Sequence, residues 1–279
     1  MLRLAVRVRR EQAEIVLAEL LELAPSGVEE AAIGSGDVVE YAVYGAPGEL
    51  PALPDVTAAA GDALVEVSTS ELADDWAERW REFHKPLVLD SQLAVRPPWE
   101  SAIGAPVEIV IDPGQAFGTG AHATTRLCLE LMLELAGGAG SLRRSPFLDL
   151  GCGSGVLAIA AARLGWDPVV ALDHDLASVS AAVGNARANG VGIEVRRHDL
   201  RVDPVALAPT VAANLLRPLL LTWAERLAPA AAAPETVIAS GLLLGEADEV
   251  AGAFAALGLV EAARRESGEW LALLLERRR

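Results

Sequence analysis

A glycine-rich turn lies between an apolar segment and an alanine-rich segment near the middle of the 279-residue chain. Residues 149–155 read D-L-G-C-G-S-G, in which the glycines are spaced as G-x-G-x-G. Glycines at such a turn can adopt backbone conformations that other residues rarely adopt, and their lack of a side chain lets a ligand approach the main chain. The next apolar segment ends at Asp173, 22 residues after Gly151, where a carboxylate can accept hydrogen bonds from ribose hydroxyls. The pattern therefore predicts a site for a ligand that contains adenosine.

The residue that follows the third glycine narrows the choice of ligand. A dinucleotide fingerprint reads G-x-G-x-x-G, with three glycines around a pyrophosphate. Here the sixth position is Val156. S-adenosylmethionine (SAM) has no pyrophosphate, so we expect SAM rather than a nicotinamide dinucleotide. The residues expected to contact it are the loop glycines and the strand-end acid, namely Gly151, Gly153, Gly155 and Asp173.

Three acids in this region each have a functional and a structural interpretation. Asp149 precedes the glycines and could hold the ammonium group of SAM, directly or through water, or could cap the following helix. Asp173 could cap the end of its strand instead of binding ribose. Asp199 follows the third predicted strand, where a contact with adenine and a plain loop position are equally open.

A second motif, residues 112–125, reads D-P-G-Q-A-F-G-T-G-A-H-A-T-T and enters a predicted helix at 126–135. Thr124 or Thr125 can cap that helix. Hydroxyl groups beside a glycine loop at a helix N-terminus can also hold the carboxylate of a cofactor. His122 is a candidate base, and a hydrogen bond that structures the loop is its alternative role.

Strands alternate with helices from about residue 145 onward, which indicates a parallel α/β sheet. The predicted strands are 147–150, 169–173, 193–196, 211–214, 236–240, 259–264 and 269–275, and the predicted helices are 156–164, 176–188, 217–227 and 245–257. A hairpin at 266–268 makes the final strand antiparallel. This is the layout of a Rossmann-like, seven-stranded class I methyltransferase domain. In it Asn214 ends the fourth strand, where its amide oxygen could orient an attacking amine or merely cap the strand.

The first 68 residues follow a different pattern. Alternating apolar residues predict a strand at 2–8, acids set against leucines predict a helix at 11–23, and further strands follow at 38–44 and 63–68. We expect a small α+β domain of ferredoxin-like type over residues 1–68, a linker helix and connector over 69–95, and a SAM-dependent methyltransferase domain over 96–279. Trp76, Trp80 and Phe83 lie on one face of the linker helix, either packed between domains or lining a substrate groove.

The charge of the chain restricts its partners. There are 39 acidic and 23 basic residues, a formal net charge of −16. Residues 1–70 contain 12 acids and four arginines, hence −8. Polyanions select basic surfaces, so direct nucleic-acid or anionic-membrane binding is disfavoured. The acidic N-terminal part is either a solvated surface or a docking face for a basic partner.

Few features of the sequence indicate where in the cell the protein acts. Cys128 and Cys152 do not make a disulfide framework, the first ten residues lack the apolar run of a signal peptide, and no apolar stretch is long enough to span a membrane. We expect a cytoplasmic protein that acts as a monomer.

The second motif resembles the D-P-G-x-A-F-G-T-G-x-H-x-T-T signature of the PrmA family, the ribosomal-protein-L-eleven methyltransferases. Further similarities are the aromatic residues at 76, 80 and 83, residues 149–155, 213–216, 240–242 and 268–270. The resemblance implies SAM-dependent methylation of lysine ε-amines, and of the N-terminal α-amine, on a basic large-subunit ribosomal protein docked by the N-terminal domain. It implies SAM contacts from Thr125, Gly151, Asp173 and Asn214, and places Phe117, Gly118, Thr119 and Gly120 near the cofactor and the incoming amine.

Other functions stay open at this point. The loop reads G-A-H-A-T-T where the family usually has G-T-H-P-T-T, so another protein or a small amine could be the acceptor. A nucleic-acid methyltransferase is disfavoured because no aromatic residue follows Asn214 as in N-P-P-[YF] motifs, and because of the charge. The intact G-x-G-x-G pattern, Asp173 and Asn214 argue against a non-catalytic SAM-binding module. Val156 disfavours an oxidoreductase.

Overall fold

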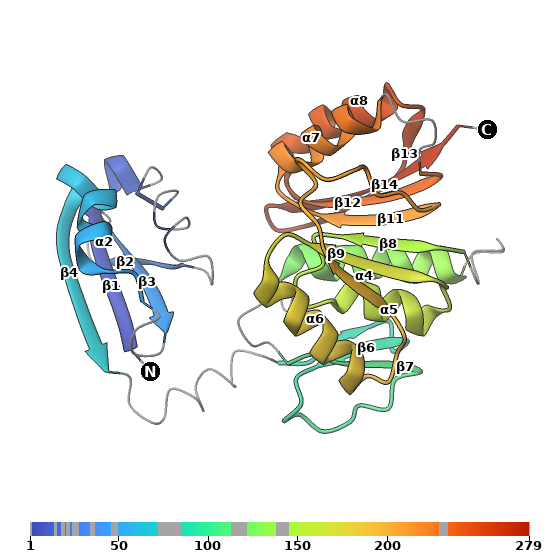
Figure 1. Cartoon of the computed structure of the whole chain (residues 1–279), viewed down its shortest axis with the longest axis horizontal. Helices are drawn as coiled ribbons and strands as arrows, with labels where there is room; N and C mark the ends of the chain where they lie inside the picture. The colour runs from blue at the N-terminus through green and yellow to red at the C-terminus, as the bar shows by residue number, and fades with distance from the viewer. Residues whose placement is uncertain are drawn as a thin grey trace. The chain divides into compact units, whose positions relative to one another are not determined.

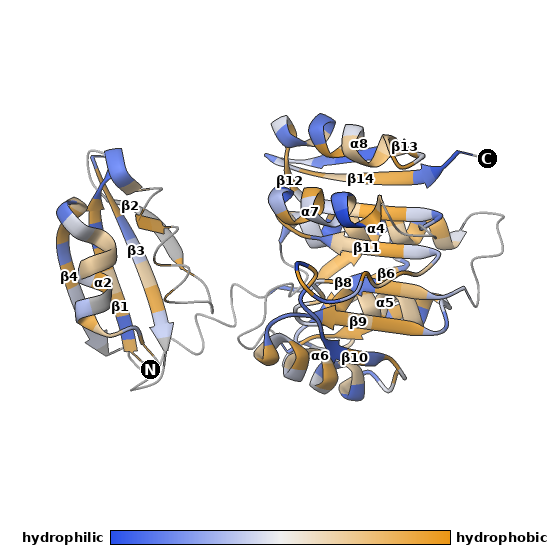
Figure 2. Cartoon of the chain, turned by 45° about the horizontal axis from the view of Figure 1, so that its top comes forward, coloured by the Kyte–Doolittle hydropathy of each residue, from blue (hydrophilic) through white to orange (hydrophobic). Residues whose placement is uncertain are grey.

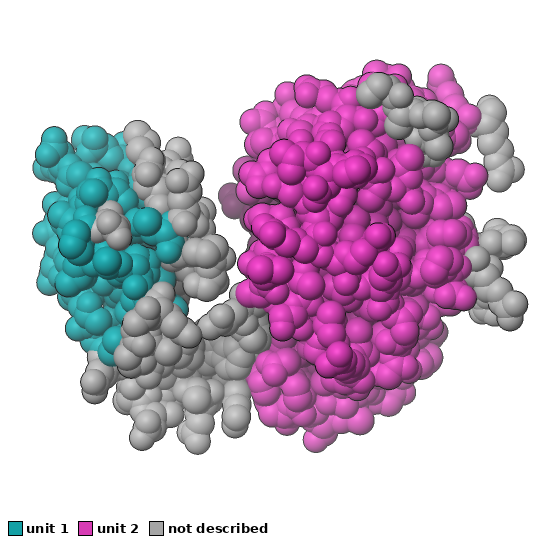
Figure 3. Space-filling model, viewed as in Figure 1, with its two compact units in different colours: residues 1–83 teal, residues 84–279 magenta. Residues whose placement is uncertain are grey.

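The chain forms two compact units, Met1–Phe83 and His84–Arg279, in a computed structural model (Figure 3). The structure describes residues 2–13, 16, 17, 20, 23, 28–33, 37–45, 50–71, 85–112, 122–137, 145–228 and 234–278. Of the expected site residues, Phe117, Gly118, Thr119 and Gly120 lie outside these ranges, as do the aromatic residues at 76, 80 and 83.

A mostly parallel sheet forms the middle of the unit His84–Arg279 (Figure 1). In the described ranges it has seven strands in the order β10-β9-β8-β11-β12-β14-β13. These are β8 (Phe147–Leu150), β9 (Val169–Asp173), β10 (Glu194–Arg197), β11 (Thr210–Asn214), β12 (Thr236–Leu243), β13 (Leu259–Ser267) and β14 (Trp270–Arg277). β14 is antiparallel to β12 and β13. The order of the strands reverses between β8 and β11, and ligands of open α/β sheets bind at the carboxyl ends of strands beside such a reversal.

Helices cover both faces of this sheet (Figure 1). One face carries α4 (Ala123–Gly137), α5 (Val156–Leu164) and α6 (Leu176–Ala188), and the other carries α7 (Arg217–Leu227) and α8 (Ala247–Ala255). Because side chains of a strand alternate between faces, Phe147 packs with the first helix layer and Leu148 with the second. Burial on both faces explains why β8 and β9 are almost wholly apolar (Figure 2). No helix in the described ranges is both long and apolar enough to cross a membrane.

A small second sheet extends the core of the same unit. It has the order β5-β6-β7, formed by β5 (Leu87–Leu89), β6 (Leu93–Arg96) and β7 (Val107–Val110). Leu93 and Ile109 are fully buried in the cluster that contains α4 and α5. This sheet leads directly into the second sequence motif at Asp112.

The unit Met1–Phe83 contains an antiparallel sheet in the order β2-β3-β1-β4. Its strands are β1 (Leu2–Arg9), β2 (Glu29–Ile33), β3 (Val38–Gly45) and β4 (Leu64–Glu71), and α2 (Leu53–Ala60) lies between β3 and β4 in the chain. Leu4, Val6 and Val8 alternate along β1 into the core of this unit. Arg3 and Arg7 lie on the opposite face of the same strand, where both bond to Glu40.

The prediction of a parallel α/β sheet with a closing antiparallel strand is confirmed. The predicted domain boundaries differ from the structure. β4 continues to Glu71 instead of ending by residue 68, and residues 87–95, placed in the predicted connector, contain β5 and most of β6 of the second unit. In the first unit β2 and α2 were not predicted, because a five-residue strand that starts with two glutamates and an eight-residue helix that contains a proline have weak patterns. Of the predicted helix at 11–23, the structure describes residues 11–13, 16, 17, 20 and 23, and residues 13, 16, 17, 20 and 23 are helical.

Candidate functional site

The glycine turn joins β8 to α5 and is bonded to the end of the neighbouring strand. Gly151, Gly153 and Gly155 all have positive φ angles, of 78°, 51° and 81°, a region that favours glycine. The amide groups of Gly151 and Cys152 both donate to the carbonyl oxygen of Leu172, at 2.8 and 3.0 Å. A side chain at Gly151 would also meet the side chain of Leu215. The turn is therefore held between the carboxyl ends of β9 and β11.

Asp149 caps the helix and also has an unused oxygen. Its Oδ2 accepts a hydrogen bond from the backbone N–H of Ala158 at 2.9 Å. Its Oδ1 is buried and has no hydrogen-bond partner among the described residues. Burial raises the pKa of this carboxyl to about 7. Because a buried polar atom without a partner costs free energy, the unused oxygen favours a ligand group beside Asp149.

Asp173 fixes the same turn from the end of β9. Its Oδ2 accepts from the Gly153 N–H at 2.9 Å, and its Oδ1 accepts from the Asp175 N–H at 3.0 Å. The strand-end cap considered from the sequence is thus present. An ionised carboxylate has about four acceptor positions, so two accepted bonds leave capacity for ribose hydroxyls.

The second motif enters α4 beside the carboxyl ends of β11 and β12. Thr124 and Thr125 lie in the first turn of α4, and each is only 1% exposed. The carbonyl oxygen of Thr124 accepts from the Ser240 hydroxyl of β12 at 3.4 Å. Thr125 Oγ1 is buried without a partner in the described ranges. A hydroxyl group in this position can donate to a carboxylate at the N-terminus of the helix.

Asn214 is connected to the second motif through Thr124. Asn214 Nδ2 donates to Thr124 Oγ1 at 3.2 Å, and Thr124 Oγ1 lies 2.8 Å from His122 Nδ1. The backbone N–H of Thr124 also donates to His122 Nδ1, at 3.3 Å. His122 Nδ1 is therefore an acceptor, which assigns the neutral tautomer with its proton on Nε2. Burial lowers the pKa of His122, in agreement with a neutral ring.

Packing around Asn214 fixes the course of the chain after β11. The N–H of Leu215 donates to the carbonyl oxygen of Ser240 at 2.9 Å. Gly241 has a φ of 84°, and a side chain there would meet the Leu215 carbonyl oxygen at 2.5 Å. The ring of Trp270 contacts His122 edge-on, with centroids 4.8 Å apart. Gly241 therefore leaves room for the backbone that follows Asn214, and Trp270 packs against His122.

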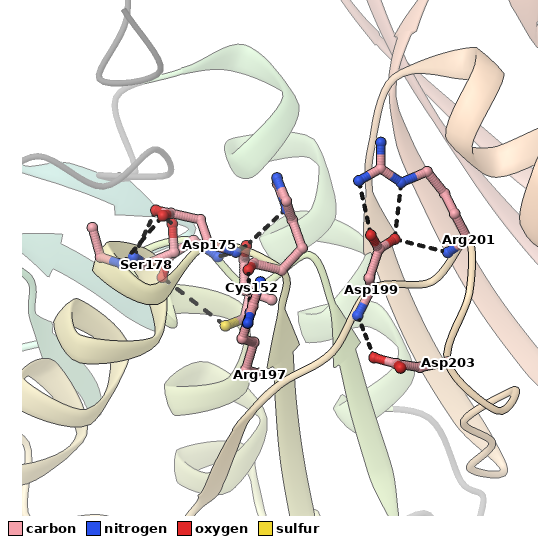
Figure 4. A network of polar contacts seen from close by, with 11 residues as sticks. Cys152, Asp175, Ser178, Arg197, Asp199, Arg201 and Asp203 are labelled. Carbon is pink, nitrogen blue, oxygen red and sulfur yellow. Dashed lines mark hydrogen bonds and ion pairs between the residues drawn. The ribbon is translucent and has the colours of Figure 1, made fainter. Parts of the chain in front are cut away.

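Asp199 lies in the loop after β10, where it pairs with Arg201 (Figure 4), and the N–H of the preceding residue, His198, donates to the Asp173 carbonyl oxygen at 2.7 Å. The Asp199 carboxylate accepts from Arg201 Nε at 2.9 Å and Nη2 at 2.8 Å, while its own N–H donates to Asp203. The hydrogen bonds from Arg201 hold the pKa of Asp199 well below its usual range. The adenine contact expected of Asp199 stays a prediction, and such a contact has to coexist with this ion pair.

The structure thus brings together most of the expected residues that it describes. Asp149 and Asp173 flank the turn that contains the three glycines. Thr125 lies in the first turn of α4, and Asn214 lies at the end of β11. Gly241 and Asn185 were not proposed from the sequence as parts of the site, whereas Thr124 was considered there together with Thr125. For Asn185 a signal was available, because two asparagines four residues apart, at 185 and 189, stand in an otherwise alanine-rich helix.

The buried atoms without partners fit the two charged ends of an amino-acid group. An acid oxygen at Asp149 suits an ammonium group, and a hydroxyl at Thr125 suits a carboxylate. SAM carries both groups beside its adenosine, so the described residues are compatible with this cofactor.

Comparisons with known proteins identify the relatives of this chain. A family model described as ribosomal protein L11 methyltransferase (PrmA) matches residues 52–278. A protein named ribosomal protein L11 methyltransferase from Pelotomaculum thermopropionicum is 40% identical over 212 residues, covering 74% of this chain and 67% of the relative. One of the same name from Geobacter sulfurreducens is 40% identical over 230 residues, covering 80% of this chain and 73% of the relative.

A solved structure extends the similarity to the fold. The ribosomal protein L11 methylase of Lactobacillus delbrueckii subsp. bulgaricus has a TM-score of 0.60 and 29% identity, over 70% of this chain and 99% of that one. The residues recognised as a resemblance in the sequence lie within the matched segment, except for the N-terminal layout. The chain belongs to the ribosomal protein L11 methyltransferase family, a family of SAM-dependent protein methyltransferases.

Proposed function

We propose that this chain transfers the methyl group of SAM to lysine ε-amines, and to the N-terminal α-amine, of ribosomal protein L11. The observation that carries the proposal is the position of Asn214 at the end of β11, bonded through Thr124 to the motif that resembles the family signature. SAM supplies a methyl group on a sulfonium, which is already electrophilic. The protein therefore has to bind the cofactor, orient an amine and keep that amine neutral.

Asp149 and Thr125 are proposed to hold the amino-acid end of SAM. Asp149 Oδ1 would accept from the ammonium group and Thr125 Oγ1 would donate to the carboxylate. Both atoms are buried and unpartnered in the described ranges, which supports the assignment. The turn glycines and Asp173 would receive the adenosine part, and Phe117, Gly118, Thr119 and Gly120 are proposed to lie near the reacting groups.

Asn214 is proposed to orient the attacking amine. Its Nδ2 donates a hydrogen bond to Thr124, and its Oδ1 can accept a hydrogen bond from the amine N–H. An ordinary lysine has a pKa of about 10.4, so making it neutral at pH 7 costs about 4–5 kcal/mol. Desolvation among apolar groups such as Leu215 lowers this cost, because burial disfavours the charged amine.

His122 is proposed to structure the site and not to act as the base. Its Nδ1 accepts hydrogen bonds from within the motif, and its ring packs on Trp270. This arrangement supports the loop-structuring role considered from the sequence. The proton of the amine would then leave to solvent.

The N-terminal unit is proposed to have a ferredoxin-like fold and to dock the basic substrate. The strand order β2-β3-β1-β4, with α2 between β3 and β4, supports the fold assignment. Glu40 and Glu66 are paired with Arg3 and Arg7, so they are poor candidates for docking. Exposed acids such as Glu11 and Asp62 are better candidates.

A direct assay tests the function. The full chain is incubated with SAM and separately with each purified large-subunit ribosomal protein, and each product is read by intact mass and peptide mapping. We expect ribosomal protein L11 to gain methyl groups on lysine side chains and its N-terminus. Methylation of a different protein, with L11 unmodified, would overturn the substrate assignment but not the transferase activity.

A further inference from the structure

Two buried asparagines, Asn185 in α6 and Asn189 at its C-cap, bond to the segment that leads into the second motif, and Asn185 also bonds to the glycine turn. Asn185 and Asn189 are 4% and 5% exposed, and they lie one helical turn apart. Asn189 Nδ2 also donates to the carbonyl oxygen of Asn185 at 2.8 Å. Buried amides in proteins are normally fully hydrogen-bonded, so their partners indicate what they hold together.

Asn185 bridges two segments that are more than 40 residues apart in sequence. Its Oδ1 accepts from the backbone N–H of Asp112 at 3.0 Å, and its Nδ2 donates to the carbonyl oxygen of Ser154 at 2.9 Å. Ser154 lies inside the glycine turn and is fully buried. Asp112 is the first residue of the second motif. The planar carboxamide of Asn185 therefore sets the distance between the glycine turn and the start of the second motif.

Asn189 bonds to the strand that precedes Asp112 but does not bond to the turn. Its Oδ1 accepts from the Val110 N–H at 2.8 Å, and its Nδ2 donates to the Val110 carbonyl oxygen at 2.6 Å. These two bonds replace those that a further strand would make at the edge of β7. Asn189 thus holds the end of β7 to the end of α6, and only Asn185 bonds to the proposed cofactor site.

We propose that Asn185 is a positioning residue that couples occupation of the glycine turn by SAM to the backbone at Asp112. A ligand that orders the turn fixes the Ser154 carbonyl, which fixes the Asn185 carboxamide and strengthens its bond to the Asp112 N–H. The backbone at Asp112 is then fixed relative to the cofactor before an amine arrives. This inference rests on the proposed SAM site at residues 149–155.

Hydrogen exchange in the wild-type full chain tests the coupling without any substitution. Amide exchange is followed by NMR with and without S-adenosylhomocysteine. We expect exchange at Asp112 to slow by about tenfold, the scale of one strengthened buried hydrogen bond, and exchange at Val110 to change by less than about twofold. Equal changes at both amides, or none at Asp112 when calorimetry shows the ligand bound, would overturn the coupling. Absence of binding would instead overturn the cofactor site.

A matched pair of variants gives a second test. Asn185→Ala and Asn189→Ala each remove one buried amide, from α6 and from its C-cap, and each removes a hydrogen bond to the segment 110–112. We expect Asn185→Ala to raise the Kd of S-adenosylhomocysteine and the KM of SAM by about tenfold, and Asn189→Ala to raise them by less than about twofold. Similar effects of the two substitutions, with similar losses in Tm, would reduce Asn185 to a structural residue and contradict the proposal.

Discussion

Asn214 Nδ2 donates a hydrogen bond to Thr124 Oγ1 at 3.2 Å, although the two residues are 90 positions apart in the sequence. The first ends a central strand and the second begins a helix on one face of the sheet. Because Thr124 also meets His122 Nδ1, the bond gives the Asn214 carboxamide one orientation. The residue that we propose orients the amine is thus aligned by the motif that resembles the family signature.

Replacing Asn214 by alanine tests its role in turnover. We expect Asn214→Ala to lower kcat by about 10²- to 10³-fold, the usual effect of losing a group that stabilises developing charge. The Kd of SAM, measured by calorimetry, should change by less than about twofold. Thr124→Val keeps the shape of the side chain, removes the hydroxyl and should cost about tenfold in kcat. Turnover at the wild-type rate in Asn214→Ala would refute the assigned role.

The pH dependence of SAM binding tests Asp149. Its pKa is raised to about 7 by burial, so the carboxyl is largely protonated at pH 6 in the free enzyme. An ammonium group beside Oδ1 favours the carboxylate, so binding expels a proton and the Kd of SAM should fall as the pH rises from about 6 to about 7.5, by at most tenfold per pH unit. Asp149→Asn should bind SAM with a weaker and flatter profile. An unchanged slope in that variant would show that another group titrates.

Gly241 tests whether the backbone after Asn214 must lie where it does. Gly241→Ala places a Cβ at 2.5 Å from the Leu215 carbonyl oxygen, whereas Gly190→Ala, also at positive φ, meets no atom within 4 Å. Both substitutions incur about 1–2 kcal/mol of left-handed strain. We expect Gly241→Ala, but not Gly190→Ala, to lower kcat by about tenfold or more, because the new side chain displaces the backbone next to Asn214. Equal losses of Tm and kcat in both variants would indicate strain alone.

Charge neutralisation in the N-terminal unit tests the docking proposal. Glu11→Gln combined with Asp62→Asn removes two exposed acids there, and Glu225→Gln combined with Glu276→Gln removes two exposed acids from the other unit. The first pair should raise the KM for ribosomal protein L11 by about two- to tenfold at low salt, since an exposed charge contributes at most about 1 kcal/mol. The effect should shrink as salt screens the charges. Equal KM values for both pairs would place docking elsewhere.

Several elements could be predicted because their patterns are local. The strands β8 and β9 and the helices α5, α6 and α7 have the predicted bounds, since each is a continuous apolar or alanine-rich run between turn residues. The glycine turn and Asp173 were recognised for the same reason, because their spacing follows from one strand, one turn and one helix. β2 and α2 were missed because their short sequences contain acids or proline and depend on partners elsewhere in the sheet.

The sequence by itself therefore determined the sheet class, the glycine turn between β8 and α5, and the strand-end positions of Asp173 and Asn214. Only the tertiary structure showed that Asn214 meets Thr124, that Gly241 supports Leu215, and that Asn185 joins Ser154 to Asp112. The physical reason lies in the range of the interactions. Backbone hydrogen bonding and hydrophobic period act over a few residues, whereas the pairing of side chains at strand ends depends on the order in which strands and helices pack.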